Sequence, residues 1–174
     1  MSANVDKIID NTIKHEGGWA NHPDDRGGKT NFGITLKTFK SLEPGKTEQD
    51  LRNLTVDQAR EFYRKHFFYG MAVDTLPKGI QDIIFDMNVN HGPRHTTRML
   101  QRALVRLGEE VIVDGVLGPK TAGAAFRLPK DDLRDSLIIC RLKFVTNFAN
   151  RVPSQRKFLR TWVNRTLSFD NVEV

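Results

Sequence analysis

Hydrophobic residues recur along this chain mainly at helical spacing. Four aliphatic residues near the N-terminus fall on one face of a helix: Val5, Ile8, Ile9 and Ile13. This spacing predicts an amphipathic helix over residues 3–15, with Glu16 in its last turn. Gly17 and Gly18 follow at once, and such residues are typical of a helix end.

The same spacing continues through the rest of the chain and predicts a mainly helical fold. Thr55 and Gln58 read as a capping box that begins a helix. Further helices are expected at about 35–41, 80–87, 99–107, 131–150 and 154–167. In the last two of these, we expect the aromatic residues to pack: Phe144, Phe148, Phe158 and Trp162.

The segment from Glu16 to Thr35 differs from these helices because glycines alternate with polar side chains. The glycines are Gly17, Gly18, Gly27, Gly28 and Gly33, and the polar residues among them include Asp24, Asp25 and Thr30. Repeated glycines indicate positive-φ turns or a close approach of the backbone to a ligand. The composition therefore predicts a loop that holds polar groups near a ligand.

Glu16 is the candidate acid of this loop. At a helix C-terminus the carbonyl dipoles disfavour negative charge, and an apolar neighbour such as Trp19 would desolvate the carboxyl. Both effects raise the pKa of a carboxylic acid, and a carboxyl that stays protonated near neutral pH can act as a general acid. The alternative interpretation is a solvated glutamate at a helix end.

The loop resembles the glycoside hydrolase 108 family of phage and bacterial muramidases. The shared motifs are Glu16-Gly17-Gly18-Trp19, Pro23-Asp24-Asp25-Arg26-Gly27-Gly28-Lys29-Thr30 and Gly33-Ile34-Thr35. Glu16, Asp25 and Thr30 also nearly reproduce the Glu, Asp and Thr spacing of many bacteriophage lysozymes, although the gap from Asp25 to Thr30 is one residue short.

The resemblance continues to the C-terminus. It includes Asp86-Met87-Asn88-Val89-Asn90, Leu100-Gln101-Arg102-Ala103-Leu104, Asp114-Gly115-Val116-Leu117-Gly118-Pro119-Lys120-Thr121 and Trp162-Val163-Asn164-Arg165. Two positions differ from the family pattern, because Thr161 replaces the usual Gly before Trp162 and a smaller residue is expected at His91.

This resemblance implies a mainly α, lysozyme-like enzyme with a small β-hairpin near the active-site loop. The implied reaction is hydrolysis of the β-1,4 bond between N-acetylmuramic acid and N-acetylglucosamine in bacterial peptidoglycan. Glu16 would be the general acid, Asp25 the second carboxylate and Thr30 a residue that orients water. Asp24 competes with Asp25 for its role.

Five further residues are expected to contact substrate. Trp19 and Phe32 offer apolar faces to sugar rings, Asn31 and Thr35 offer hydrogen bonds, and Asn90 follows from the resemblance. Each of these also has a packing or turn-forming interpretation. No cofactor and no metal are expected, because the histidines and aspartates fit no common zinc spacing.

Two other functions remain open at this stage. A lytic transglycosylase would use one catalytic glutamate on the same bond and would leave 1,6-anhydro products. A catalytically silent wall-binding phage protein would depend instead on the C-terminal region, where the Asp114 to Pro119 turn resembles that of small peptidoglycan-binding modules. The same turn also reads as a simple tight connection, with Gly for positive φ and Pro at the start of a helix.

The interrupted pattern at Leu76 to Gly79 predicts a boundary between a catalytic lobe, residues 1–79, and a helical peptidoglycan-binding-like lobe, residues 80–174. We expect the second lobe to pack on the first, and the alternative is one compact domain. The single cysteine, Cys140, reads as a buried structural thiol.

The net charge of +6 lies mostly in the second lobe, and residues 134–165 contain eight basic residues against one acidic residue. This charge predicts an anionic partner, with lipopolysaccharide or acidic wall polymers ahead of nucleic acid, for which no motif is present. We expect a monomer.

The N-terminus has no signal-peptide pattern, and no apolar stretch is long enough to cross a membrane. We therefore expect synthesis in the host cytoplasm and action on the wall after holin-type release, followed by lysis of the host cell.

Overall fold

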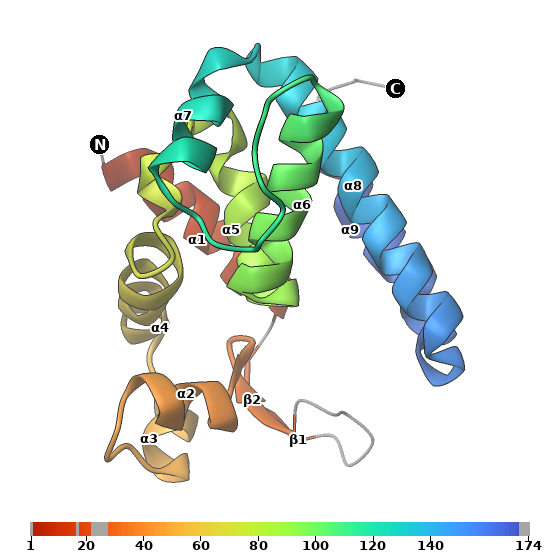
Figure 1. Ribbon diagram of the computed structural model, residues 1–174. Coiled ribbons are helices and arrows are strands. Elements are labelled where there is room, and N and C mark those ends of the chain that lie inside the picture. The colour runs from red at the N-terminus through yellow and green to blue at the C-terminus, as the bar shows by residue number, and fades with distance from the viewer. Residues whose placement is uncertain (1, 17, 22–27, 171–174) are drawn as a thin grey trace. The chain divides into compact units, whose positions relative to one another are not determined.

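The computed structural model describes residues 2–16, 18–21 and 28–170, and these form a mainly helical fold with one small antiparallel sheet (Figure 1). The chain divides into two compact units, an N-terminal unit of residues 1–71 and a C-terminal unit of residues 72–174. No helix among the described residues is long and apolar enough to cross a membrane.

The N-terminal unit contains short helices around a sheet of three strands. Its elements are α1 (Ser2–Glu16), β1 (Ala20–Asn21), β2 (Lys29–Asn31), β3 (Ile34–Thr35), α2 (Leu36–Leu42), α3 (Glu48–Arg52), α4 (Val56–Tyr63) and the π-helix η1 (Arg64–Tyr69). The predicted capping box is confirmed, because Thr55 accepts from the Gln58 backbone while the Gln58 side chain accepts from the Thr55 backbone.

Helix α1 is held against α4 and the start of η1 by apolar packing and by two ion pairs. The four predicted aliphatic residues are all at most 8% exposed: Val5, Ile8, Ile9 and Ile13. Along the edge of this contact, Arg60 Nε lies 2.6 Å from Asp10 Oδ1, and Arg64 pairs with Asp6. Burying one such aliphatic side chain stabilises a fold by about 1.5–3 kcal/mol, so packing is the main anchor of α1.

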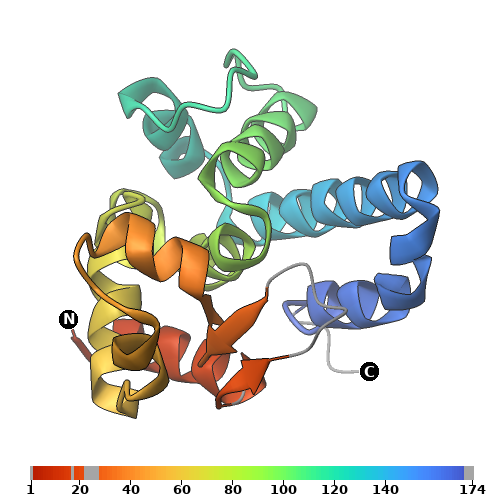
Figure 2. The ribbon, with the colours of Figure 1, turned by 90° about the horizontal axis from the view of Figure 1, so that it is seen from below.

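The C-terminal unit is built from helices and short 3₁₀ segments. Its elements are η2 (Val73–Thr75), η3 (Lys78–Ile80), α5 (Gln81–His91), α6 (Pro93–Arg106), α7 (Pro119–Arg127), α8 (Lys130–Arg151), η4 (Pro153–Phe158) and α9 (Leu159–Leu167). Helix α8 packs against α6 and, after the turn at η4, against α9, which returns along it as a helical hairpin (Figure 2).

The apolar stripes predicted from the sequence form the core of this unit. Buried members on α5 and α6 are Ile83, Ile84, Met87, Met99, Leu100, Ala103 and Leu104. Phe148 and Phe158 pack against the Trp162 ring, as expected, while 39% and 41% of their surfaces stay exposed. Cys140 is free and half-buried, and burial raises the pKa of its thiol.

The turn after α6 has a structural role that accounts for each of its residue types. Gly115 adopts φ 84°, and Pro119 is the first residue of α7, both as the sequence predicts. Gln101 on α6 ties the turn down: its Nε2 donates to Asp114 Oδ1 at 2.7 Å, and its Oε1 accepts from the Gly115 backbone at 2.8 Å. The turn therefore connects α6 to α7 in a fixed geometry.

A buried ionic cluster joins three helices of the C-terminal unit. Asp86 on α5 forms an ion pair with Arg141 on α8, with Oδ2 and the guanidinium 2.6 Å apart. Its other oxygen lies 2.9 Å from Arg165 Nε on α9. Asp86 and Arg141 are 5% and 2% exposed. Removing one partner of such a buried pair leaves an uncompensated charge and typically costs about 3–5 kcal/mol, so this cluster fixes how α5, α8 and α9 meet.

His91, at the end of α5, extends this cluster as a neutral acceptor. Arg141 Nε lies 3.3 Å from His91 Nε2, so the arginine donates and the imidazole nitrogen must be unprotonated. Burial and the nearby Arg141 charge lower the pKa of His91 from 6.5 to about 3. As the pH falls, the unfolded chain therefore binds a proton at His91 at a higher pH than the folded chain does.

Acid should for this reason destabilise the C-terminal unit between pH 6.5 and about 3. The contribution of His91 to the free energy of unfolding is complete above pH 6.5. It is lost as the pH falls toward 3, by at most about 1.4 kcal/mol per pH unit. In His91→Gln, urea unfolding at a series of pH values should show a shallower loss of stability over this window. His95→Gln, at an exposed neighbour, is the control, and equal slopes in wild type and His91→Gln would contradict this assignment.

Candidate active site

Glu16 is the last residue of α1, and β1 begins four residues later. The helix therefore ends at Glu16, as predicted. Because α1 is anchored on α4, the backbone of Glu16 has a fixed place in the N-terminal unit at the negative end of a helix dipole. The other two carboxylates of the hypothesis, Asp24 and Asp25, lie outside the described residues, in the segment that connects β1 to β2.

The register of the sheet sorts the predicted residues onto two faces. Ala20 lies opposite Thr30, and Thr30 lies opposite Thr35. Directly opposed residues of antiparallel strands point to the same face, so Thr30 and Thr35 share one face of the sheet. Neighbouring residues along a strand point to the other face, which therefore carries Lys29, Asn31 and Ile34.

The second face of the sheet is used for packing. Lys29 Nζ lies 2.7 Å from Glu48 on α3, and Asn31 Nδ2 donates to the carbonyl of Leu51 at 2.9 Å. Asn31 and Ile34 are 3% and 2% exposed. Asn31 therefore ties β2 to the end of α3, and its geometry gives no support to the predicted substrate contact.

Thr30 and Thr35 are both half-buried, but their hydroxyls have different tasks. Thr35 caps α2, where its Oγ1 accepts from the backbone of Thr38 at 3.1 Å and donates to the Thr38 hydroxyl at 2.9 Å. Among the described residues, the Thr30 hydroxyl has no hydrogen-bond partner. Of the two threonines on this face, Thr30 is thus the one whose hydroxyl is available to a ligand.

The turn between β2 and β3 holds Phe32 in an uncommon conformation. Phe32 and Gly33 have φ angles of 50° and 77°, so both occupy the left-handed region that a tight hairpin turn requires. A phenylalanine enters this region at a cost, which tertiary contacts must offset. The buried Tyr63 on α4 supplies one, because its hydroxyl donates to the Phe32 carbonyl at 2.8 Å.

Trp19 stands directly before β1 and is half-buried. The Arg52 guanidinium, at the end of α3, lies 5.5 Å from the centroid of its ring and covers one side of it. This is a cation–π contact that restricts the indole.

Asn90, the remaining predicted substrate residue, belongs to the C-terminal unit, where its side chain is exposed and donates to the Asp86 carbonyl at 2.7 Å.

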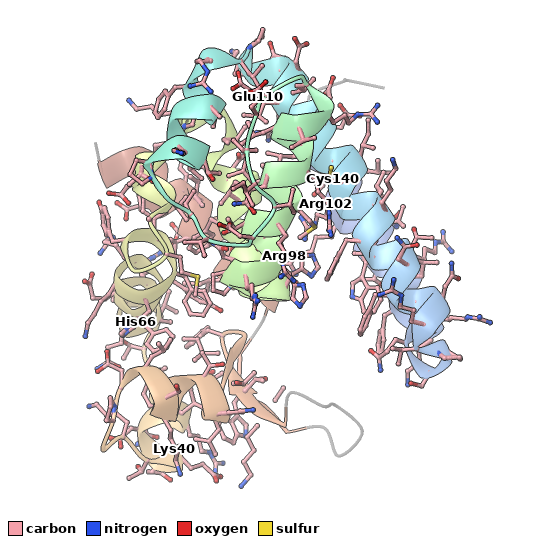
Figure 3. All side chains as sticks on the ribbon, viewed as in Figure 1. Lys40, His66, Arg98, Arg102, Glu110 and Cys140 are labelled. Carbon is pink, nitrogen blue, oxygen red and sulfur yellow. The ribbon has the colours of Figure 1, made fainter. Side chains whose placement is uncertain are left out.

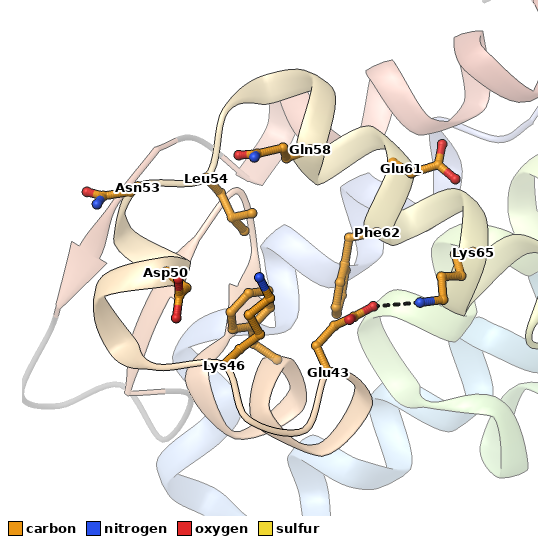
Figure 4. Close-up of a pocket in the computed structure, with 10 residues that line it drawn as sticks. Glu43, Lys46, Asp50, Asn53, Leu54, Gln58, Glu61, Phe62 and Lys65 are labelled. Atoms are coloured by element: carbon orange, nitrogen blue, oxygen red, sulfur yellow. Dashed lines mark hydrogen bonds and ion pairs between the residues drawn. The ribbon is translucent and has the colours of Figure 1, made fainter.

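A separate cavity of about 350 Å³ in the N-terminal unit contains carboxylates that cannot serve as the acid (Figure 4). Lys65 Nζ lies 2.9 Å from Glu43 Oε1, and His66 Nε2 lies 2.6 Å from the same oxygen. These hydrogen bonds lower the pKa of the Glu43 carboxyl, and the bond from Lys65 has the larger effect. Bonds from Thr47 likewise lower the pKa of Asp50. Both groups therefore stay ionised at neutral pH and have no proton to give.

The fold and the site together define a class of protein. A helix that ends at a glutamate, followed by a small antiparallel sheet in a mainly helical chain, agrees with a lysozyme-like glycoside hydrolase, and the comparisons point to the same class. Residues 9–92 match the family model of glycosyl hydrolase 108, and residues 95–167 match that of a predicted peptidoglycan domain.

The N-terminal segment of this chain is therefore similar to glycosyl hydrolase family 108, and its C-terminal segment is similar to a predicted peptidoglycan domain. Among solved structures, that of Brucella abortus SagA is similar, with 28% identity, a TM-score of 0.76 and coverage of 99% of both chains. The comparison with curated proteins found no match. The chain is accordingly a lysozyme-like enzyme that acts on peptidoglycan.

The role of Asn31 can be tested by separating stability from substrate affinity. In Asn31→Ala the carbonyls of Leu51 and Arg52 each lose one hydrogen bond, which should lower the free energy of unfolding by about 0.5–1.5 kcal/mol. Under conditions where the variant is folded, KM should match that of wild type. Asn53→Ala, at an exposed asparagine nearby, is the control. An unchanged stability with a raised KM would restore Asn31 as a substrate contact.

Proposed function

We propose that this enzyme hydrolyses the β-1,4 bond between N-acetylmuramic acid and N-acetylglucosamine, with Glu16 as general acid. The observation that carries the proposal is the position of Glu16, which ends an anchored helix within a glycosyl hydrolase 108 segment. The dipole of α1 disfavours a negative charge at this point and so favours a protonated carboxyl.

In the proposed reaction, Glu16 transfers its proton to the glycosidic oxygen as the bond from that oxygen to C1 of the muramic acid breaks. The electron pair of the bond leaves with the oxygen, and positive charge develops on the sugar ring. Water then adds to C1 and loses a proton. The products are two chain ends, one of which is a reducing N-acetylmuramic acid.

The second carboxylate is proposed to be Asp25, with Asp24 as the alternative one residue closer to Glu16. Its task is either to take the proton of the attacking water or to stabilise the positive charge on the ring. Thr30 suits the task of orienting that water, because its hydroxyl is on the sheet face opposite the packed one and has no partner among the described residues. Trp19 and Phe32 are proposed to contact the sugar rings.

Replacement of Glu16 by Gln tests this proposal because it removes the acid and keeps the shape. Clearing of a peptidoglycan suspension by Glu16→Gln should fall by at least about a hundredfold, the usual size of a general-acid contribution. Asp24→Asn and Asp25→Asn, assayed in parallel, identify the second carboxylate as the one whose loss reduces turnover more. Circular dichroism establishes that each variant is folded, and clearing by Glu16→Gln at the wild-type rate would refute the proposal.

We further propose that the enzyme acts as a phage endolysin, which is made in the host cytoplasm, reaches the wall after holin-type release and lyses the host cell. The support is the combination of a glycosyl hydrolase 108 segment with a peptidoglycan domain in one basic chain. Such a chain combines wall recognition with wall cleavage, which lysis from within requires.

Expression in a bacterial host tests this role. Culture turbidity should fall when the chain is produced together with a holin, and should not fall when either is produced alone. Glu16→Gln produced with the holin is the matched control and should leave the culture intact. Lysis without the holin, or none with it although the purified enzyme digests walls, would contradict the proposed role.

A further inference from the structure

The C-terminal unit contains a groove of about 750 Å³ that is lined by the end of α5, by α6 and α8, and by Trp162 of α9. Its lining combines cations with aromatic rings, and none of the described residues that line it is acidic. The cations are Arg98 and Arg102 on α6 and Lys143 and Arg151 on α8. Figure 3 shows Arg98 and Arg102 on the side of α6 that faces α8, near Cys140.

The basic residues of this unit fall into two groups with different surroundings. Three of those in the 134–165 run are paired internally, since Arg134 binds Asp82 while Arg141 and Arg165 bind Asp86. These charges serve the fold and are not available to a partner. The four groove cations, in contrast, form no ion pair with any residue that the structure describes.

The groove therefore gathers positive charge that the fold does not neutralise. Arg98 and Arg102 are one helical turn apart, and like charges at this spacing repel each other and destabilise a helix. An anionic ligand would turn this repulsion into attraction. Lys143 and Arg151 are eight residues apart on α8, a distance of about 12 Å, which an extended peptide covers with about four residues.

Aromatic side chains supply the apolar part of the lining. The Phe144 ring lies 5.0 Å from the His91 ring and 5.2 Å from the His95 ring. Phe148 lies 5.7 Å from Trp162, and 39% of its surface is exposed. A lining of both cations and aromatic rings fits a ligand that has carboxylates beside small apolar groups. A polyphosphate chain would be bound by the cations alone and would make no use of the aromatic rings.

We propose that this groove binds the anionic peptide stem of peptidoglycan. The stem is a short peptide that carries free carboxylates beside alanine methyl groups, so its chemistry complements both parts of the lining. The match of residues 95–167 to a peptidoglycan domain covers α6, α8 and α9, the helices that form the groove. The inference rests on the proposed function in one respect: the ligand is the peptide part of the polymer whose glycan part the enzyme cleaves.

Calorimetric titration of the full-length Glu16→Gln protein tests this proposal. Its probes are the free stem tetrapeptide that contains diaminopimelate, the disaccharide without peptide, and lipopolysaccharide. The tetrapeptide should bind, and Arg102→Gln with Lys143→Gln should weaken it at least tenfold. Both residues are exposed, so the variant should fold. The control, Arg156→Gln with Arg160→Gln, removes the same charge from exposed positions outside the groove and should change binding less than twofold.

Three results would overturn the proposal. Equal losses in the two double variants would mean that net charge alone attracts the peptide. Groove-dependent binding of the disaccharide without binding of the tetrapeptide would assign the groove to the glycan, and groove-dependent binding of lipopolysaccharide alone would assign it to phosphate. Cleavage of peptide-free glycan chains by the wild-type enzyme is measured separately, so a failure of the muramidase proposal is distinguished from a failure of the groove proposal.

Discussion

The packing of α1 against α4 is the constraint on which the proposed chemistry depends. Glu16 gains its place from a helix whose apolar face is buried along its length and whose charged edge is paired with Arg60 and Arg64. Without that anchor the chain around Glu16 would have no fixed direction relative to the sheet. A general acid requires such a fixed position, because proton transfer works only within hydrogen-bond reach of the leaving oxygen.

In the small sheet, some residues hold the fold together and another is available for chemistry. Along β2, Lys29 and Asn31 point toward α3 and hold the strand, while Thr30 between them points to the other face. In this strand, Lys29 and Asn31 thus stabilise the fold, and Thr30 is available to a ligand. The C-terminal unit likewise has two groups of cations, since some pair with carboxylates of the fold and others line an open groove.

The sequence was most informative where interactions are local. The helix that ends at Glu16, the capping box at Thr55 and the positive φ of Gly115 each follow from residues within a few positions of one another, and all three are present. Hydrophobic periodicity was less informative about the sheet. Its strands have only two or three residues, too few to show an alternation of hydrophobic and polar residues. The face of Asn31 follows only from the strand register.

The features that the sequence did not reveal depend on residues far apart in the chain. Asp86 and Arg165 are separated by 79 positions, so a run of basic residues gave no sign that part of its charge is consumed inside the fold. His91 was noted as larger than expected, but its role as an acceptor for Arg141 required the arrangement of α5 and α8. Exposed aromatics such as Phe148 follow the same helical spacing as core residues and were indistinguishable from them.

The most direct test of the central claim is the chemistry of the product. Purified peptidoglycan would be digested by the wild-type enzyme in water enriched in the heavy oxygen isotope, and the fragments analysed by mass spectrometry. Hydrolysis assisted by Glu16 predicts one heavy oxygen atom at each new reducing N-acetylmuramic acid. Fragments that end in 1,6-anhydro rings without heavy oxygen would contradict it, because the muramoyl 6-hydroxyl would then have attacked in place of water.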